Sequence, residues 1–81
     1  MKTYILIQAM PQVDRSELVQ WVVRVPGVDR VEAVTGPYDL IAEARSDDAV
    51  GVLGAIAEIG GVLRAIDAPV VGAADREPAA A

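Results

Sequence analysis

The residues best suited to chemistry lie close together in the segment from Val34 to Leu40. A hydroxyl, a flexible glycine, an aromatic ring and a carboxylate occur there in quick succession, on Thr35, Gly36, Tyr38 and Asp39. A free amino acid needs an anion beside its ammonium group, N–H donors beside its carboxylate and an apolar wall. These residue types could supply all three. A structural alternative remains open, in which Gly36-Pro37 is only a turn that Asp39 fixes by hydrogen bonds to the backbone.

Other kinds of site find little support in the composition. The chain has no cysteine and no histidine, so it lacks thiolate and imidazole ligands and the commonest general base. Seven Lys and Arg against twelve Asp and Glu give a net charge of −5, which disfavours contact with phosphate backbones. Asp47 and Asp48, close to Glu43, are better explained by a helix start than by a metal site. We therefore expect no catalytic residue, no metal, no cofactor and no direct nucleic-acid binding.

Length and composition indicate one small domain with an apolar surplus. The chain has 81 residues, of which 53% are hydrophobic, and its only aromatic residues are Trp21, Tyr4 and Tyr38. A domain this short buries only about 60 to 65% of its unfolded surface, so part of the aliphatic material is expected to face a partner. No apolar run approaches the roughly 20 residues of a membrane span, and no signal peptide is evident. We expect a cytoplasmic protein that does not contact a membrane.

Six elements are expected to position the candidate residues. Short β-branched runs predict strands, apolar residues at helical spacing predict helices, and Pro26-Gly27 and Gly60-Gly61 end the two helices. The expected order is strand, helix, strand, strand, helix, strand: 2–10, 14–24, 28–35, 40–45, 46–59 and 62–71. Residues 72–81 show no periodic apolar pattern and are expected to form a flexible tail after a domain of residues 1–71.

The two halves of the chain resemble each other in a single register. Tyr4 aligns with Tyr38, Asp14 with Asp48, and further matches fall at turns and in strands: Leu6 with Leu40, Ile7 with Ile41, Gly27 with Gly61, Val28 with Val62, and Arg30 with Arg64. One βαβ unit used twice predicts a ferredoxin-like α+β fold, βαββαβ. Its four-stranded antiparallel sheet carries both helices on one face.

The opposite face of this sheet is expected to be open and apolar. Strand alternation places Leu40, Ala42 and Ala44 under the helices. The internal repeat and the same alternation then assign five aliphatic residues to the open face: Ile5, Ile7, Val34, Ile41 and Ile66. Covering them would favour a face-to-face dimer, a dimeric α/β barrel. The alternative is a solvated face, which its charged residues Arg30, Glu32, Glu43, Arg45 and Arg64 favour.

The segment from Ala33 to Ala42 resembles the effector domain of the Lrp/AsnC family of feast/famine transcriptional regulators. Pro26-Gly27-Val28 before it and the run Gly60 to Arg64 after it extend the resemblance to residues 2–71. The resemblance implies a domain that dimerises through its sheets, forms rings of dimers and binds small effectors, usually amino acids, between dimers. By position it implicates Thr35, Gly36, Tyr38 and Asp39 in contacting or positioning the effector.

Two departures from the family pattern leave alternatives open. The helix-turn-helix domain that usually comes first is not seen before Met1, so a stand-alone effector domain is expected, one able to join a full-length regulator in a mixed assembly. Ala65 and Asp67 stand where family members often carry threonines, so the effector could differ or be absent, leaving a pure assembly subunit. An enzyme of the dimeric monooxygenase type shares the topology, but that class often relies on His or Asn, and both are missing.

Overall fold

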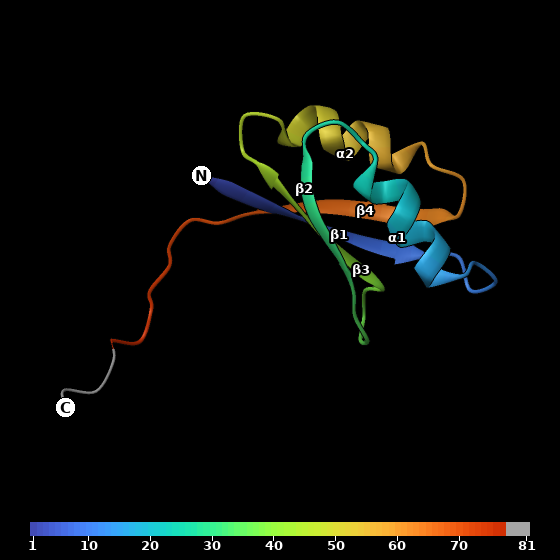
Figure 1. The fold of residues 1–81 in the computed structure, drawn as a ribbon, viewed down its shortest axis with the longest axis horizontal. Helices are drawn as coiled ribbons and strands as arrows, with labels where there is room; N and C mark the ends of the chain where they lie inside the picture. The colour runs from blue at the N-terminus through green and yellow to red at the C-terminus, as the bar shows by residue number, and fades with distance from the viewer. Residues whose placement is uncertain (78–81) are drawn as a thin grey trace.

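The computed structural model describes residues 1–77 and confirms the expected order of elements (Figure 1). The loop from Met10 to Asp14 and the turn from Ser46 to Asp48 each join a strand to the helix that follows it. The elements are β1 (Lys2–Ala9), α1 (Arg15–Val23), β2 (Val28–Ala33), β3 (Leu40–Arg45), α2 (Ala49–Ala57) and β4 (Val62–Pro69). This is the βαββαβ arrangement of the ferredoxin-like α+β fold.

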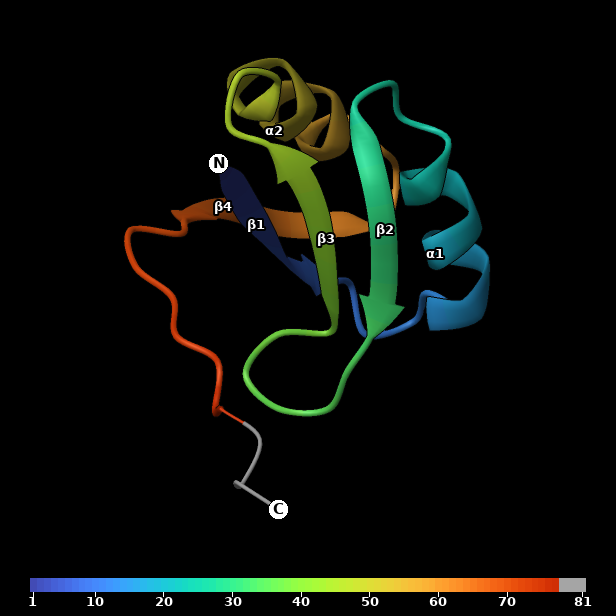
Figure 2. The same ribbon diagram turned by 60° about the vertical axis from the view of Figure 1, so that its left-hand side comes forward.

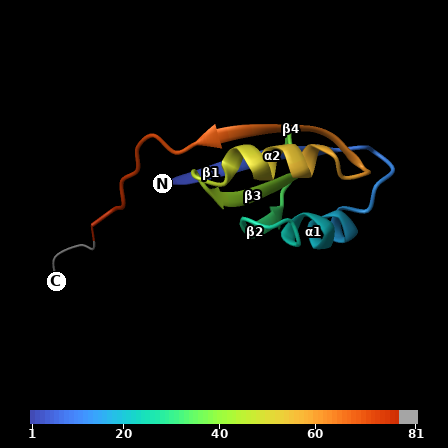
Figure 3. The ribbon, with the colours of Figure 1, turned by 90° about the horizontal axis from the view of Figure 1, so that it is seen from above.

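The four strands form one antiparallel sheet in the order β2-β3-β1-β4 (Figure 2). Leu6 on β1 lies opposite Ile41 on β3 and Ile66 on β4, so one row of side chains crosses three strands. Helix α1 packs on β2 and α2 on β4, and Figure 3 shows the two helices beside these two strands. The central pair β1 and β3 therefore receives cover from both helices.

The core lies between the sheet and the helices. Every second residue of β1 is buried, and Leu40, Ala42 and Ala44 on β3 are buried as expected. Leu18 and Val22 of α1 belong to the same core. The other buried hydrophobic residues lie on β1, α2 and β4: Ile5, Ile7, Ala9, Ala49, Val52, Ile56 and Val62. The aliphatic side chains fill this layer without any Phe.

The assignment of Ile5 and Ile7 to the open face was wrong, because both are completely buried under the helices. Ile5 pairs with Ala42 and Ile7 with Leu40, which puts them on the covered face. The internal repeat holds at the helix caps but slips by one residue in the first strand of each half, β1 and β3. One more residue separates Ala9 from Asp14 than separates Ala44 from Asp48. A slip of one residue moves a whole strand to the other face.

The repeat does hold at the turns that follow the helices. Gly27 and Gly61 both adopt positive φ, 95° and 101°, where an L side chain would be strained. The cap residues are also equivalent, although only Asp14 accepts hydrogen bonds from the first turn, from the N–H groups of Ser16 and Glu17. Asp48 makes no such bond with its side chain.

The chain beyond β4 has neither helix nor strand as far as it is described. Val70 still donates to the Lys2 carbonyl, and Figure 1 shows the chain after it running away from the body of the domain. The predicted tail of residues 72–81 falls partly on residues 78–81, which lie outside the described part. Within residues 1–77, no helix has both the length and the apolar character that crossing a membrane requires.

Candidate functional site

The candidate residues share one loop, residues 34–39, which joins β2 to β3 and extends past one end of the sheet (Figure 2). Its base is closed by the Val34 N–H, which donates to the Asp39 carbonyl at 2.8 Å. The Asp39 N–H donates to the Ile7 carbonyl at 2.9 Å, so the loop is also tied to β1. Only its base is fixed by these bonds.

Thr35 and Gly36 are exposed at the outer part of this loop, and Tyr38 is half-buried nearer its base. Gly36 has φ 140°, and a Cβ added to it would have no neighbouring atom within 4 Å. The carbonyl of Pro37 accepts a long hydrogen bond, 3.4 Å, from the side chain of Gln8 on β1. The hydroxyl and the flexible glycine are thus open to a ligand, while the ring is closer to the protein body.

Asp39 has a different environment from the other three residues. Its Oδ2 accepts from the Ala9 N–H at 2.7 Å, and its Oδ1 accepts from the Arg15 Nη2 and Nε at 2.8 and 3.2 Å. Its side chain retains 20% exposure. The Ala9 N–H first, and the Arg15 guanidinium second, lower the pKa of the Asp39 carboxyl below its ordinary value.

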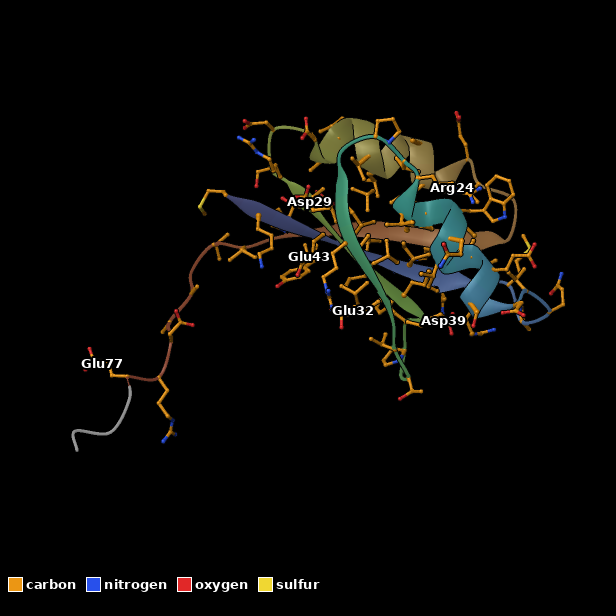
Figure 4. All side chains as sticks on the ribbon, viewed as in Figure 1. Arg24, Asp29, Glu32, Asp39, Glu43 and Glu77 are labelled. Atoms are coloured by element: carbon orange, nitrogen blue, oxygen red, sulfur yellow. The ribbon has the colours of Figure 1, made fainter. Side chains whose placement is uncertain are left out.

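Sequence reasoning found the loop but missed the two side chains that hold it, Arg15 and Gln8. Figure 4 shows Asp39 beside the start of α1, where Arg15 is the first helical residue. No spacing rule joins position 15 to position 39, because the contact exists only once α1 has packed on the sheet. The alternative considered for Asp39 was a carboxylate that fixes the turn by hydrogen bonds to the backbone. The hydrogen bond that it accepts from the Ala9 N–H is of this kind.

The open face of the sheet carries a row of three aliphatic side chains. Leu6, Ile41 and Ile66 lie side by side on β1, β3 and β4, and each is half-buried. Ile41 and Ile66 were expected there, whereas Leu6 takes the place predicted for Ile5 and Ile7. Val34, the fifth expected residue, lies beyond the end of β2 at the base of the loop.

Charged groups flank this aliphatic row, on neighbouring rows and at its β2 end, where Glu32 continues it. Lys2 lies 3.6 Å from the Glu43 carboxylate and donates to the Tyr4 hydroxyl at 3.3 Å. The hydrogen bond to Tyr4 first, and the charge of Glu43 next, raise the pKa of Lys2. Arg30 pairs with Glu32 at 3.2 Å along β2. Exposed pairs of this kind add little to stability, and they leave the aliphatic row as the main apolar feature of the face.

No group of three or more potential metal ligands lies together anywhere in residues 1–77. The same part of the chain encloses no ligand-sized cavity. The acidic run that was considered as a cation site, Asp47 and Asp48, lies at the start of α2.

Comparison with solved structures identifies the fold. TTHA0845 from Thermus thermophilus superposes with a TM-score of 0.77 at 28% identity, over 93% of this chain and 98% of that one. AsnC from E. coli gives 0.73 at 17% identity, and the transcriptional regulator NMB0573 from Neisseria meningitidis, in complex with L-Met, gives 0.70 at 22%. This chain shares the fold of AsnC-type regulators.

The AsnC-type fold accounts for nearly all of this chain but only part of those regulators. The match covers 95% of this chain and 54% of E. coli AsnC, and 93% of this chain and 52% of the Neisseria regulator. The chain therefore spans about half the length of each regulator, whereas it matches the Thermus protein over almost all of its length. The sequence itself matches no protein-family profile and no curated protein.

Proposed function

We propose that this chain is an effector-binding and oligomerisation module of the Lrp/AsnC type, and that its ligand is a small molecule of the amino-acid class. The observation that carries the proposal is the β2–β3 loop, which is fixed at its base and open at its tip. The likeness in fold to AsnC-type regulators supports it, and one of these regulators is described as a complex with L-Met.

The loop offers two of the three kinds of group that an amino acid needs, namely hydrogen-bonding groups and an apolar wall. The Thr35 hydroxyl and the backbone around Gly36 are the accessible hydrogen-bonding groups, and the Tyr38 ring provides an apolar wall. Asp39 acts in this scheme mainly as a positioning residue, because each of its oxygens already accepts a hydrogen bond from the chain itself.

The assembly part of the proposal rests on the open face of the sheet. A second copy that packs on Leu6, Ile41 and Ile66 would bring two aliphatic rows together and remove both from water. An isologous dimer needs a patch that complements itself, and a central apolar row with charges on neighbouring rows and at its β2 end meets that need. Rings of such dimers, and mixed assemblies with a full-length regulator, belong to the same proposal.

A thermal-shift screen against the twenty amino acids tests the ligand part. We expect at least one amino acid to raise the melting temperature, because a ligand that binds only the folded state stabilises it. The variants Thr35→Val and Tyr38→Ala should reduce the rise, and Gln20→Ala, on the exposed side of α1, should leave it unchanged. A rise that is equal in all four proteins would remove the loop from the site.

A specific observation also favours a second function, that of a pure assembly subunit. The aliphatic row does not depend on the loop, so dimerisation could serve a mixed ring without any effector. A chain that dimerises but responds to none of the twenty amino acids would fit this second function and contradict the first.

Direct DNA binding by these 81 residues is not part of either function. With a net charge of −5, the chain offers no excess of cations to replace the counterions of a duplex. Gel retardation at physiological salt should show no shifted band, and tight binding that weakens steeply with salt would contradict the proposal.

A further inference from the structure

Asp39 joins three parts of the chain that are far apart in sequence. Its carboxylate accepts from the Ala9 N–H at the end of β1 and from Arg15 at the start of α1. Its own N–H donates to the carbonyl of Ile7. Apart from the long bond from Gln8 to the Pro37 carbonyl, the β2–β3 loop is therefore held to the sheet and to α1 through this one residue. Of its three links, only the one to α1 joins two side chains.

Arg15 is placed to make this link rigid. Its Nε and Nη2 both donate to Asp39 Oδ1, and its Nη1 donates to the Val13 carbonyl at 3.1 Å. Three of its donors are thus aimed at two fixed acceptors. A lysine cannot reproduce this, because its ammonium is a single point charge on a flexible stem.

We propose that Arg15 is a positioning residue for the β2–β3 loop, coupling α1 to the site that the proposed function assigns to that loop. Charge-assisted hydrogen bonds to the base of the loop hold it in one conformation before a ligand arrives. A loop ordered in advance loses less conformational entropy on binding, so the affinity for ligand is higher. The proposal rests on the proposed function for its ligand part and on the geometry alone for its structural part.

A merely exposed ion pair would behave differently. Side chains with the exposures seen here, 40% for Arg15 and 20% for Asp39, often contribute nothing measurable when only their charges interact. In that case Arg15→Lys would equal the wild type in every respect. The fork geometry predicts instead that Arg15→Lys falls between the wild type and Arg15→Gln.

Amide hydrogen exchange in the protein without ligand tests the structural part. The Val34 and Asp39 amides report on the base of the loop, and the Val52 amide, bonded to the Asp48 carbonyl in α2, reports on the rest of the fold. We expect Arg15→Gln to speed exchange at Val34 and Asp39 by about tenfold with Val52 unchanged. Arg24→Gln, near the other end of the helix, is the matched control and should change none of the three.

The two possible failures are separate. Exchange at Val34 and Asp39 within about twofold of the wild type, or an equal increase at Val52, would overturn the role of Arg15 whether or not a ligand is found. Titration of the same twenty amino acids tests the ligand part, with an expected loss of about tenfold in affinity for Arg15→Gln. Intact affinity in a variant with a loosened loop would also overturn it, while a wild type that binds no amino acid contradicts only the proposed function.

Discussion

If the open face of the sheet is the dimer interface, Leu6→Ala should weaken the dimer. Leu6 is the middle member of the aliphatic row, between Ile41 and Ile66, and it is half-buried in the single chain. It lies on the face away from the helices, so its truncation leaves the core intact. In an isologous dimer the substitution occurs twice in the same interface, which doubles its effect on association.

The size of the effect follows from the apolar surface that remains exposed. Truncation removes three carbon atoms from each copy, and each buried CH₂ is worth about 0.8 kcal/mol. Full burial on association would give roughly 5 kcal/mol for the two copies, and the cover that the side chain already has within one chain reduces this to about 0.5 to 2 kcal/mol. Since about 1.4 kcal/mol is a factor of ten, the dimer dissociation constant should rise roughly 2- to 30-fold.

Sedimentation equilibrium over a range of protein concentrations measures this constant directly. Val50→Ala is the matched control, because Val50 is 86% exposed on α2, on the other side of the sheet. We expect the control to dimerise like the wild type and Leu6→Ala to dissociate at concentrations where the control does not. Equal dissociation constants for the two variants, or a wild type that stays monomeric at about 100 μM, would refute the assignment of this face as the interface.

Three further sites test the fold and the loop. Asp39→Asn should weaken the loss of stability at low pH. The pKa of the Asp39 carboxyl in the folded protein lies below the ordinary 3.8. The stability that the carboxylate adds is therefore present above 3.8 and is lost as pH falls through the lowered value. Melting temperature against pH measures this, and parallel acid limbs would contradict it. Gly27→Ala should destabilise by about 1 to 3 kcal/mol, because φ is 95° and the new Cβ would lie 2.8 Å from a methyl of Val52. Its control Gly54→Ala, in open space on α2, should stabilise by about 0.5 to 1 kcal/mol, and urea denaturation compares the two. Ile5→Ala should lower the free energy of unfolding by about 2 to 5 kcal/mol in the same measurement, because Ile5 is completely buried. A loss below about 1 kcal/mol would contradict its place in the core.

Local patterns along the chain were enough to predict the elements and their topology. Strand runs, the cap at Asp14 and the glycines at 27 and 61 are local signals, because backbone geometry and hydrogen bonding over a few residues create them. The covered residues of β3 were also predictable, since alternation within a short strand is strict. The segment that carries Thr35 and Tyr38 was found from residue types alone.

The buried face of β1 and the bonds that hold the loop became known only from the packed domain. The face depends on one residue of loop length between Ala9 and Asp14, and a repeat in the sequence does not reveal which of its two copies carries the insertion. The bonds of Asp39 to Ala9 and Arg15 join positions that no short spacing relates. Such contacts arise when a helix and a sheet pack together, because packing brings side chains into reach that the chain itself keeps apart.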